Sequence, residues 1–386
     1  MNRKQRRASE KGRPPPSPAD TRDPIILHAA GVEAFRAGNL DLAADLITRA
    51  IAANGRMPDF HYNLAIVLRA RGKLQEAAAS YERAILLKPD YADAYNNLGN
   101  ICKTLGLLDK ARACFEQALL CKPDNADTHY NLGILRSDTG DKDQAALHFS
   151  RCLDLDPDDS RGVRILLAHL GLASAPERTS PAQLLSIYDV RSRFWDRENS
   201  YFGHALVAEG LQQHAAHHKL DILDIGCGTG LVGALVRPLA SRLDGVDISP
   251  AMLEKARDKK LYDGLDQADF VSFMSGHKDS YDAILGAATL IHFGDLHAVF
   301  QAAAASLRNN GLFVFTLFSS GAEETDFAVA SNDKLAQSGC YTHSAGYVER
   351  LAPESGFSVQ MLKTAIHERD QNGDPVPGLL AVLRRV

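Results

Sequence analysis

The spacing of apolar residues changes once along this chain of 386 residues, and the change divides it into two parts. Between residues 24 and 159, apolar side chains recur with the period of amphipathic helices, and glycines and prolines separate the helical stretches. From about residue 184, helical stretches alternate with short, almost continuously apolar runs. The first pattern predicts an all-helical part. The second predicts an α/β part built on a parallel, doubly wound sheet.

The helical part is an internal repeat with a period of 34 residues, as Pro89, Pro123 and Pro157 show. A degenerate first copy begins near Pro24. The pattern resembles the tetratricopeptide repeat family, in which paired helices bury their apolar faces only by stacking into a superhelix. The same spacing relates Leu64, Leu98 and Leu132, Gly72, Gly106 and Gly140, and Ala77, Ala111 and Ala145.

Three asparagines, Asn63, Asn97 and Asn131, hold the same register on successive first helices of the repeats. In tetratricopeptide arrays that position faces the concave groove. An amide both donates and accepts hydrogen bonds, so this ladder is suited to the backbone of an extended peptide. Hydrogen bonds between helices within the array are the alternative. We expect the groove to bind a protein or peptide partner.

Composition sets the boundaries of the predicted parts. Residues 1–23 are basic and proline-rich, which predicts a disordered tail. The array and a capping helix at Ser160–Ala173 occupy residues 24–173, and "SAPERTSPAQ" at residues 174–183 is typical of a linker. Residues 184–386 form the α/β domain. The whole chain is therefore expected to be multidomain.

Charge and cysteine usage exclude several classes of function. The net charge of −5 argues against nucleic-acid binding, and no apolar run approaches the ~20 residues of a membrane span. The six cysteines are scattered, which suits reduced thiols in the cytoplasm. No metal-ligand spacing occurs, so we expect neither a metal nor a membrane partner.

A glycine-rich turn follows the first apolar run of the α/β part. The run "DILDI" leads into Gly226, Gly228 and Gly230, and a helical stretch follows. Glycines permit positive φ and let a ligand approach the backbone. Gly228, Gly230 and Gly233 spell the dinucleotide fingerprint, but that match starts two residues too late after the strand. The register therefore favours S-adenosylmethionine over NAD.

The stretch "DIGCGTG" resembles motif I of the class I S-adenosylmethionine-dependent methyltransferases, and the likeness extends over roughly residues 184–386. The last two apolar runs, joined by "HERDQNGDPVPG", predict a β-hairpin. The resemblance implies a Rossmann-like methyltransferase fold with an antiparallel strand seven. The order of the two parts is similar to that of a bacterial group of predicted methyltransferases with tetratricopeptide repeats.

The resemblance also implies which residues bind the cofactor. Gly226, Gly228 and Gly230 would let the methionine part approach, Asp247 would accept from the ribose hydroxyls, and Asp269 from the adenine amino group. The alternative role of Asp247 is that of a helix cap, and the alternative role of Asp269 is that of a turn residue. The full set expected at the cofactor is Asp224, Gly226, Gly228, Gly230, Asp247, Met252, Asp269 and Phe270, with Tyr188, Trp195 and Tyr201 on an aromatic lid.

Three residues are candidates for catalysis because they follow strands four and five, where the methyl acceptor should lie. They are His292, Tyr341 and His343, and histidine is suited to removing a proton near neutral pH. Relatives often have an aspartate where Ala288 stands. Positioning alone is the alternative source of catalysis.

These observations predict a cytoplasmic S-adenosylmethionine-dependent methyltransferase. Its repeat array would bind a protein partner or a carrier-bound substrate. The alternative is a tetratricopeptide adaptor whose methyltransferase-like domain only binds S-adenosylmethionine.

Overall fold

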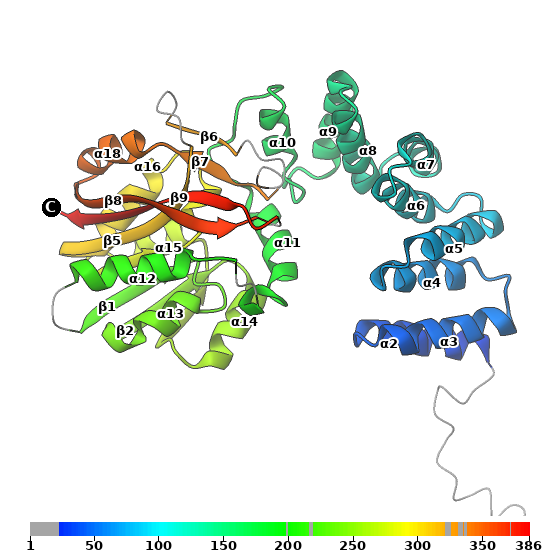
Figure 1. Cartoon of the computed structure of the whole chain (residues 1–386), viewed down its shortest axis with the longest axis horizontal. Helices are drawn as coiled ribbons and strands as arrows, with labels where there is room; N and C mark the ends of the chain where they lie inside the picture. Colours follow the sequence, from blue (N-terminus) through cyan, green and yellow to red (C-terminus); the bar gives the residue numbers. More distant parts are fainter. Residues whose placement is uncertain are drawn as a thin grey trace, which may run out of the picture. The chain divides into compact units, whose positions relative to one another are not determined.

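The helices of the repeats follow the 34-residue period of the sequence. A computed structural model describes residues 23–197, 200–215, 219–320, 326–330, 335, 338–370 and 372–386. Except for Asp23, the predicted tail lies outside these residues. By its contacts the chain divides into two units, Met1–Leu155 and Asp156–Val386. Figure 1 shows helices alone in the first unit and a sheet with helices in the second.

The described residues of the first unit form four helix pairs, which confirms the predicted repeats. At each turn within a pair a glycine adopts positive φ, for example Gly72 at 76° and Gly140 at 82°. Where paired helices cross, Gly99 and Gly133 pack against the rings of Phe115 and Phe149. The helices are α2 (Pro24–Arg36), α3 (Leu40–Ala53), α4 (Pro58–Ala70), α5 (Leu74–Leu87), α6 (Ala92–Thr104), α7 (Leu108–Cys121), α8 (Ala126–Asp138) and α9 (Lys142–Leu155).

The second unit begins with α10 (Val163–His169) and α11 (Pro181–Arg191). The predicted capping helix is present as the shorter α10, which starts after Gly162 at a φ of 71°. Its contacts place it with the sheet rather than with the array. Residues 174–183, whose composition suggested a linker, are hydrogen-bonded to the sheet domain, as described below.

A sheet of mostly parallel strands forms the centre of the second unit. Its order is β3-β2-β1-β4-β5, and β9 pairs antiparallel with β5 and carries β8 on its other edge. This confirms the closing hairpin and the antiparallel last strand. The strands are β1 (Leu220–Ile225), β2 (Ala240–Asp247), β3 (Gly264–Gln267), β4 (Tyr281–Gly286), β5 (Leu307–Ser319), β8 (Phe357–Arg369) and β9 (Pro375–Arg385).

Two further strands, β6 (Phe327–Val329) and β7 (Tyr341–His343), were not predicted. β5 continues past the end of β4, and its Phe318 pairs with Thr342 of β7 on one side and Gly378 of β9 on the other. The short β6–β7 ladder therefore extends the sheet beyond the carboxyl end of β4.

Neighbouring residues of a strand point to opposite faces of the sheet. Helices cover both faces and form a hydrophobic core with each. Leu223 belongs to a core with α15, α16 and α18, and Ile222 to a core with α12 and α13. These helices are α12 (Gly203–His214), α13 (Leu231–Val236), α15 (Phe270–Gly276), α16 (His297–Ser306) and α18 (Ala345–Glu354); α14 (Pro250–Lys259) follows β2.

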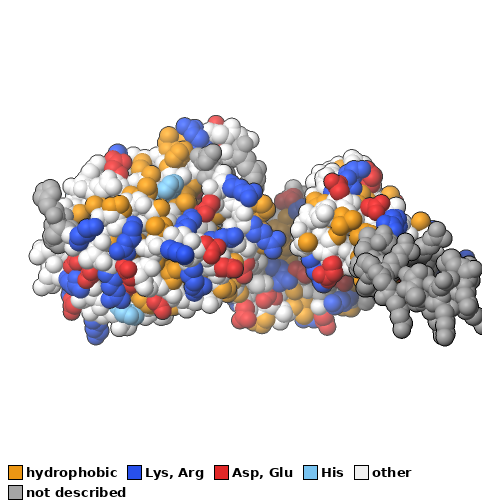
Figure 2. Space-filling model, turned by 90° about the horizontal axis from the view of Figure 1, so that it is seen from below, with side chains coloured by type: hydrophobic (Ala, Val, Ile, Leu, Met, Phe, Trp, Pro, Cys, Tyr) orange, Lys and Arg blue, Asp and Glu red, His pale blue; other side chains and the backbone are white. Residues whose placement is uncertain are grey.

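The surface of the second unit carries charges of both signs. Figure 2 shows Lys and Arg side chains interspersed with Asp and Glu on the visible face, without one continuous basic area among the coloured residues. Over the described ranges, no helix combines the length and apolar character needed to cross a membrane.

Candidate functional site

A pocket of the second unit lies at the carboxyl ends of β1, β2 and β4, the edge at which open parallel sheets bind ligands. It contains Gly226, Gly228, Asp247, Met252, Asp269, Phe270, Tyr188, Trp195, Tyr201 and His292, which are ten of the residues expected from the sequence. It also contains Arg178, Leu184, His204, Cys227, Leu231, Val232, Ile248, Ala268, Ala287, Ala288, Thr289 and Phe293.

The glycine loop is held against the end of β2. Gly226 and Cys227 donate their N–H groups to the carbonyl of Val246, at 2.8 and 3.1 Å. Gly226 has a φ of 62°, and a Cβ there would lie 2.3 Å from Thr289 Oγ1. Gly228 has a φ of 55°, and a Cβ there would meet only the carbonyl oxygen of Gly226, at 3.9 Å. The open space in front of Gly228 is a cradle that any larger residue would fill.

Asp247 ends β2 and faces the pocket. Its Oδ2 accepts from Gly228 N–H and its Oδ1 from Ser249 N–H, both at 2.8 Å. Burial raises the pKa of Asp247 to about 6, although these backbone donors counteract the rise. Ile248 N–H is a third backbone donor to this carboxylate. Because a carboxylate has about four acceptor positions, it can still accept from a ligand hydroxyl. The N-terminus of α14 is capped by Ser249, whose Oγ accepts from Met252 N–H at 3.2 Å.

Two residues expected at the cofactor are absent from the pocket lining. Asp224 is buried behind the loop, where its Oδ2 accepts from the Tyr262 hydroxyl at 2.7 Å. Burial raises the pKa of Asp224 to about 7. Gly230, at a φ of 88°, starts α13 beside the same tyrosine ring. Both residues lie beside Tyr262 on the side of the glycine loop that faces away from the pocket.

Arg178 contacts the end of the pocket at which the adenine is expected. Its guanidinium forms an ion pair with Asp269 Oδ2 at 2.8 Å and lies 5.1 Å from the centre of the Phe293 ring. Asp269 also caps α15, since its Oδ1 accepts from Ser272 N–H at 3.2 Å. The alternative expected for Asp269 is a turn residue, and the structure instead makes it the N-cap of α15. Phe270 packs on Phe293 at 5.2 Å between ring centres.

The aromatic residues expected on a lid form one cluster over the other end of the pocket. Trp195, in the 3-10 helix η2 (Trp195–Arg197), lies 5.8 Å from Tyr188 and 5.6 Å from Tyr201 between ring centres. Polar bonds hold this segment to the rest of the site. Asp189 accepts from Ser249 Oγ at 2.7 Å, and Asp196 pairs with Lys259 at 2.8 Å.

His292 ends the 3-10 helix η4 (Leu290–His292) and is buried in the pocket wall. Its Nδ1 lies 2.9 Å from the carbonyl of Gly339, which can only accept, so Nδ1 carries the proton. In the neutral ring, Nε2 then accepts from the Tyr188 hydroxyl at 2.7 Å. Burial lowers the pKa of His292 to about 4, which keeps the ring neutral.

Tyr341 and His343, the other catalytic candidates, do not line this pocket. Tyr341 is buried and donates its hydroxyl to the carbonyl of Pro176 at 2.7 Å. His343 is buried too; its Nε2 donates to the carbonyl of Gly294 at 3.1 Å, and burial lowers its pKa to about 4. The structure gives both side chains a role in fixing the loops behind His292.

Three residues of the site escaped sequence reasoning. Arg178 lies in the stretch interpreted as a linker, and its partner Asp269 is distant in the sequence. His204 lines the pocket with a buried Nδ1 that has no partner among the described residues. Thr289 Oγ1 donates a hydrogen bond to the carbonyl of Ile225 at 3.0 Å, and the Thr289 side chain packs against Gly226. For Thr289, the sequence offers one signal of a role in the site, namely its place shortly after strand four.

In the array, the three asparagines expected in the groove bond to the preceding repeat. The donor atom is the amide nitrogen Nδ2 in each case. Asn63 reaches His28 Nε2 at 2.8 Å, Asn97 the Tyr62 hydroxyl at 3.0 Å and Asn131 the Asn96 Oδ1 at 3.0 Å. These contacts match the alternative expectation, hydrogen bonds between helices within the array, because the amides join successive first helices.

Comparisons with known families agree with this geometry. A model described as a methyltransferase domain matches residues 223–313. Models of tetratricopeptide repeats match residues 67–106 and 90–158.

Two curated relatives match parts of the chain. One is a malonyl-[acyl-carrier protein] O-methyltransferase of Acetivibrio thermocellus, 33% identical over 102 residues, which are 26% of this chain and 36% of the relative. The other is a ubiquinone biosynthesis O-methyltransferase of Vibrio cholerae, 24% identical over 182 residues, which are 44% of this chain and 74% of the relative.

A solved structure also matches, namely the Burkholderia thailandensis 1,6-didemethyltoxoflavin-N1-methyltransferase with bound 1,6-didemethyltoxoflavin and S-adenosylhomocysteine. It is 18% identical, with a TM-score of 0.43, over 53% of this chain and 87% of that one. The family matches and the sequence motifs give the identity of the two parts. The chain carries tetratricopeptide repeats followed by an S-adenosylmethionine-dependent methyltransferase domain.

Proposed function

We propose that the second unit transfers the methyl group of S-adenosylmethionine to a hydroxyl acceptor held beside His292 and Tyr188. One observation carries the choice of cofactor. Two carboxyl groups, the buried Asp224 and the half-buried Asp247, lie at the glycine loop, and Asp247 raises the pKa of Asp224. In the described lining the one lysine or arginine is Arg178, which is paired with Asp269.

This charge pattern favours a cationic ligand. S-adenosylmethionine carries a sulfonium and an α-ammonium group, and both gain from the Asp247 carboxylate in a site of low dielectric. The described lining offers the pyrophosphate of a dinucleotide no unpaired lysine or arginine, because Arg178 is paired with Asp269. The open cradle at Gly228 and the remaining acceptor capacity of Asp247 also suit the methionine and ribose parts. The residues present therefore fit this cofactor.

The chain's own residues would then bind and orient. Asp247 would accept from the ribose hydroxyls, and Gly228 would let the amino-acid part approach. The ring faces of Tyr188, Trp195 and Tyr201 would exclude water and attract the sulfonium. When bound, S-adenosylmethionine supplies an electrophilic methyl group, and in-line displacement needs mainly positioning.

The Tyr188–His292 pair would hold the acceptor. A hydroxyl placed against the Tyr188 oxygen can pass its proton through that hydroxyl to His292 Nε2. With its low pKa of about 4, His292 is a weak base. The transfer becomes favourable as the new C–O bond forms, because the acceptor oxygen then turns strongly acidic. We infer that the pair orients the acceptor first and removes the proton late.

The acceptor itself is proposed from the pocket walls. Near Tyr188, Trp195 and Tyr201 the described lining residues are aromatic or apolar, apart from the neutral His204 and His292. This end suits an uncharged, flat hydroxy compound. The two curated relatives are named O-methyltransferases, and the name of one of them specifies malonyl-[acyl-carrier protein].

We propose further that the repeat array binds a protein partner or a carrier that brings this substrate. Since the amide nitrogens of Asn63, Asn97 and Asn131 are held by the preceding helices, their Oδ1 atoms are left in fixed orientations. Such acceptors suit the N–H groups of an extended peptide.

Cofactor binding tests the proposal directly. Calorimetry should show binding of S-adenosylhomocysteine and no binding of NADH. Asp247→Ala should weaken the binding by about 1.5–3 kcal/mol for each charge-assisted hydrogen bond lost. Asp258→Ala, at an exposed position of the same helix α14, serves as the matched control and should leave the affinity unchanged.

Label transfer separates an enzyme from an adaptor. With radiolabelled S-adenosylmethionine and a host lysate, the wild-type chain should label a protein or small-molecule fraction, and Asp247→Ala should not. Binding without any transfer would favour the adaptor role. Binding of NADH in place of S-adenosylhomocysteine would overturn the proposal.

A further inference from the structure

Residues 176–180, which we call the strap, run along the loops that carry His292. Thr179 N–H donates to the carbonyl of His292 at 2.8 Å, and Gly294 N–H donates to the carbonyl of Glu177 at 2.7 Å. Between them, Arg178 and Phe293 form an antiparallel bridge. The Tyr341 hydroxyl holds the strap from the other side through Pro176. The strap is thus an ordered segment bridged to the loop that carries His292, on the wall of the pocket.

The side chain of Thr179 reaches the anchor of His292. Thr179 is fully buried, and its Oγ1 donates to the carbonyl of Gly339 at 2.5 Å. The same carbonyl accepts from His292 Nδ1. Gly339 has a φ of 70°, and a Cβ there would lie 2.6 Å from Thr179 Cγ2. Thr179 therefore fixes the one acceptor that selects the tautomer and ring orientation of His292.

The side chain of Arg178 reaches the opposite end of the pocket. Its ion pair with Asp269 holds Oδ2 of the carboxylate, while Oδ1 stays on the N-terminus of α15. With both oxygens held, the carboxylate has one orientation in which to meet a ligand amino group. Adjacent residues of the strap thus act at two ends of one site.

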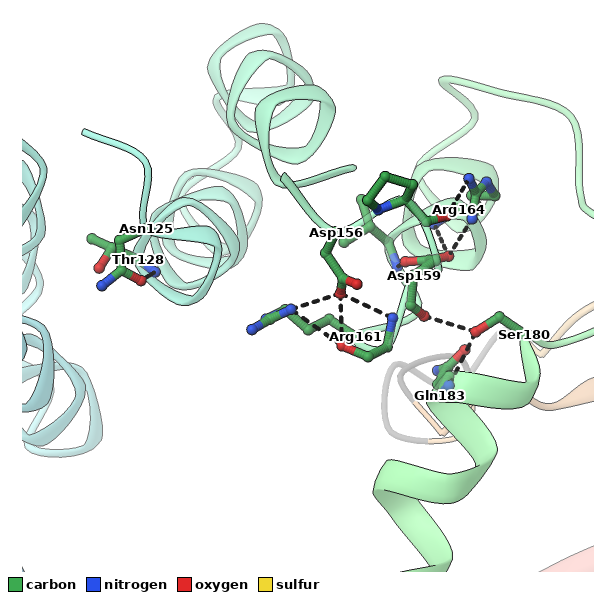
Figure 3. A network of polar contacts seen from close by, with 11 residues as sticks. Asn125, Thr128, Asp156, Asp159, Arg161, Arg164, Ser180 and Gln183 are labelled. Atoms are coloured by element: carbon green, nitrogen blue, oxygen red, sulfur yellow. Dashed lines mark hydrogen bonds and ion pairs between the residues drawn. The ribbon is translucent and has the colours of Figure 1, made fainter. Parts of the chain in front are cut away.

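The strap is also fixed to the turn at the start of the second unit, as Figure 3 shows. Ser180 Oγ donates to the carbonyl of Asp159 at 2.8 Å. The Asp159 carboxylate accepts from Val163 N–H at 2.6 Å and Arg164 N–H at 3.1 Å, which fixes the start of α10. Consecutive strap residues therefore join α10, His292 and Asp269 in one hydrogen-bonded system.

We propose that the strap is a working part of the active site, in which Arg178 belongs to the cofactor site at its adenine end and Thr179 is a positioning residue for His292. The proposal rests on the proposed methyltransferase function. It assigns functional residues to a segment whose composition indicates only a linker and which lies outside the matched residues 223–313.

The test of Arg178 uses binding alone, measured by calorimetry on the full chain. Arg178→Met should weaken both S-adenosylhomocysteine and adenosine by about tenfold, because the loss lies at the adenine end. Arg350→Met, an exposed arginine paired with Asp326, is the control and should bind both compounds as the wild type does. Unchanged affinity of Arg178→Met would overturn its assignment.

The test of Thr179 uses nitrogen NMR of ¹⁵N-histidine-labelled protein, with the His292 signals assigned by comparison with His292→Gln. In the wild type His292 should show a single tautomer with the proton on Nδ1. Thr179→Val should give a mixture of tautomers and leave S-adenosylhomocysteine affinity unchanged, and Thr179→Ser should restore the wild-type spectrum. Thr364→Val, at an exposed position of β8, is the control.

The outcomes separate this proposal from the proposed function. A wild-type chain that fails to bind S-adenosylhomocysteine contradicts the function itself. A chain that binds it, and whose Thr179→Val spectrum matches the wild type, contradicts the positioning role. If Thr179→Val does not fold, Thr179→Ala provides the same deletion of the hydroxyl without added bulk, and the same two results decide.

Discussion

Asp224 is a buried carboxylic acid, and within the described residues its side chain accepts a hydrogen bond from the neutral Tyr262 hydroxyl at 2.7 Å. Burial raises its pKa from 3.8 to about 7. A raised pKa means that the folded state binds the proton more tightly than the unfolded chain does. The stabilisation is therefore complete below pH 3.8 and is lost as the pH rises to about 7.

Asp224→Asn should remove this pH dependence, because the amide keeps an acceptor for Tyr262 and carries no charge. Relative to the wild type, the variant should gain a few kcal/mol in the free energy of unfolding between pH 4 and pH 8. Urea unfolding without ligand, followed by the fluorescence of Trp195, the single tryptophan, measures the difference. A difference that stays constant with pH would show that Asp224 is already ionised in the folded protein at pH 4.

The register of short motifs predicted those site residues that follow directly from a strand end. Gly226, Gly228 and Asp247 line the pocket because their positions after β1 and β2 fix where they point. Asp224 and Gly230 belong to the same motif, yet a motif does not say which of its residues face the ligand. Arg178 could not be found this way, since its role depends on folding against Asp269.

At the scale of helices and strands, local periodicity predicted most of the fold. The repeat helices obey one 34-residue period, so each copy supports the assignment of the others. The three-residue strands β6 and β7 are too short to leave a pattern, and they exist because β5 runs past β4. The segment 174–183 has the composition of a linker, but its order comes from hydrogen bonds to distant loops.

The crossing of paired repeat helices depends on a glycine against an aromatic ring. In α8, a Cβ on Gly133 would lie 2.6 Å from the Phe149 ring. Gly133→Ala should therefore destabilise the array by about 1–3 kcal/mol through overpacking, in spite of the better helix propensity of alanine. Urea unfolding followed by circular dichroism measures this. The double variant with Phe149→Leu should recover most of the loss, and a double variant as unstable as the two losses added would contradict the contact.

At the scale of the whole molecule, the two units have separate hydrophobic cores. The array buries residues such as Tyr81 and Phe115, and the sheet unit buries residues such as Phe300 and Phe313. The cofactor pocket and the strap belong entirely to the second unit. All described lining residues of that pocket belong to the second unit, so a ligand bound there stabilises the second unit directly.

We expect thermal unfolding of the full chain to occur in two transitions, of which S-adenosylhomocysteine raises only one. At a ligand concentration of 100 times Kd, the second unit should gain about 2.7 kcal/mol, or roughly 5–10 °C in its midpoint. Trp195 lies in that unit and reports its transition, whereas circular dichroism reports both. Gly133→Ala should lower only the other transition. If the ligand shifted both midpoints equally, the two units would unfold as one, and the array could not be treated as an independent partner-binding module.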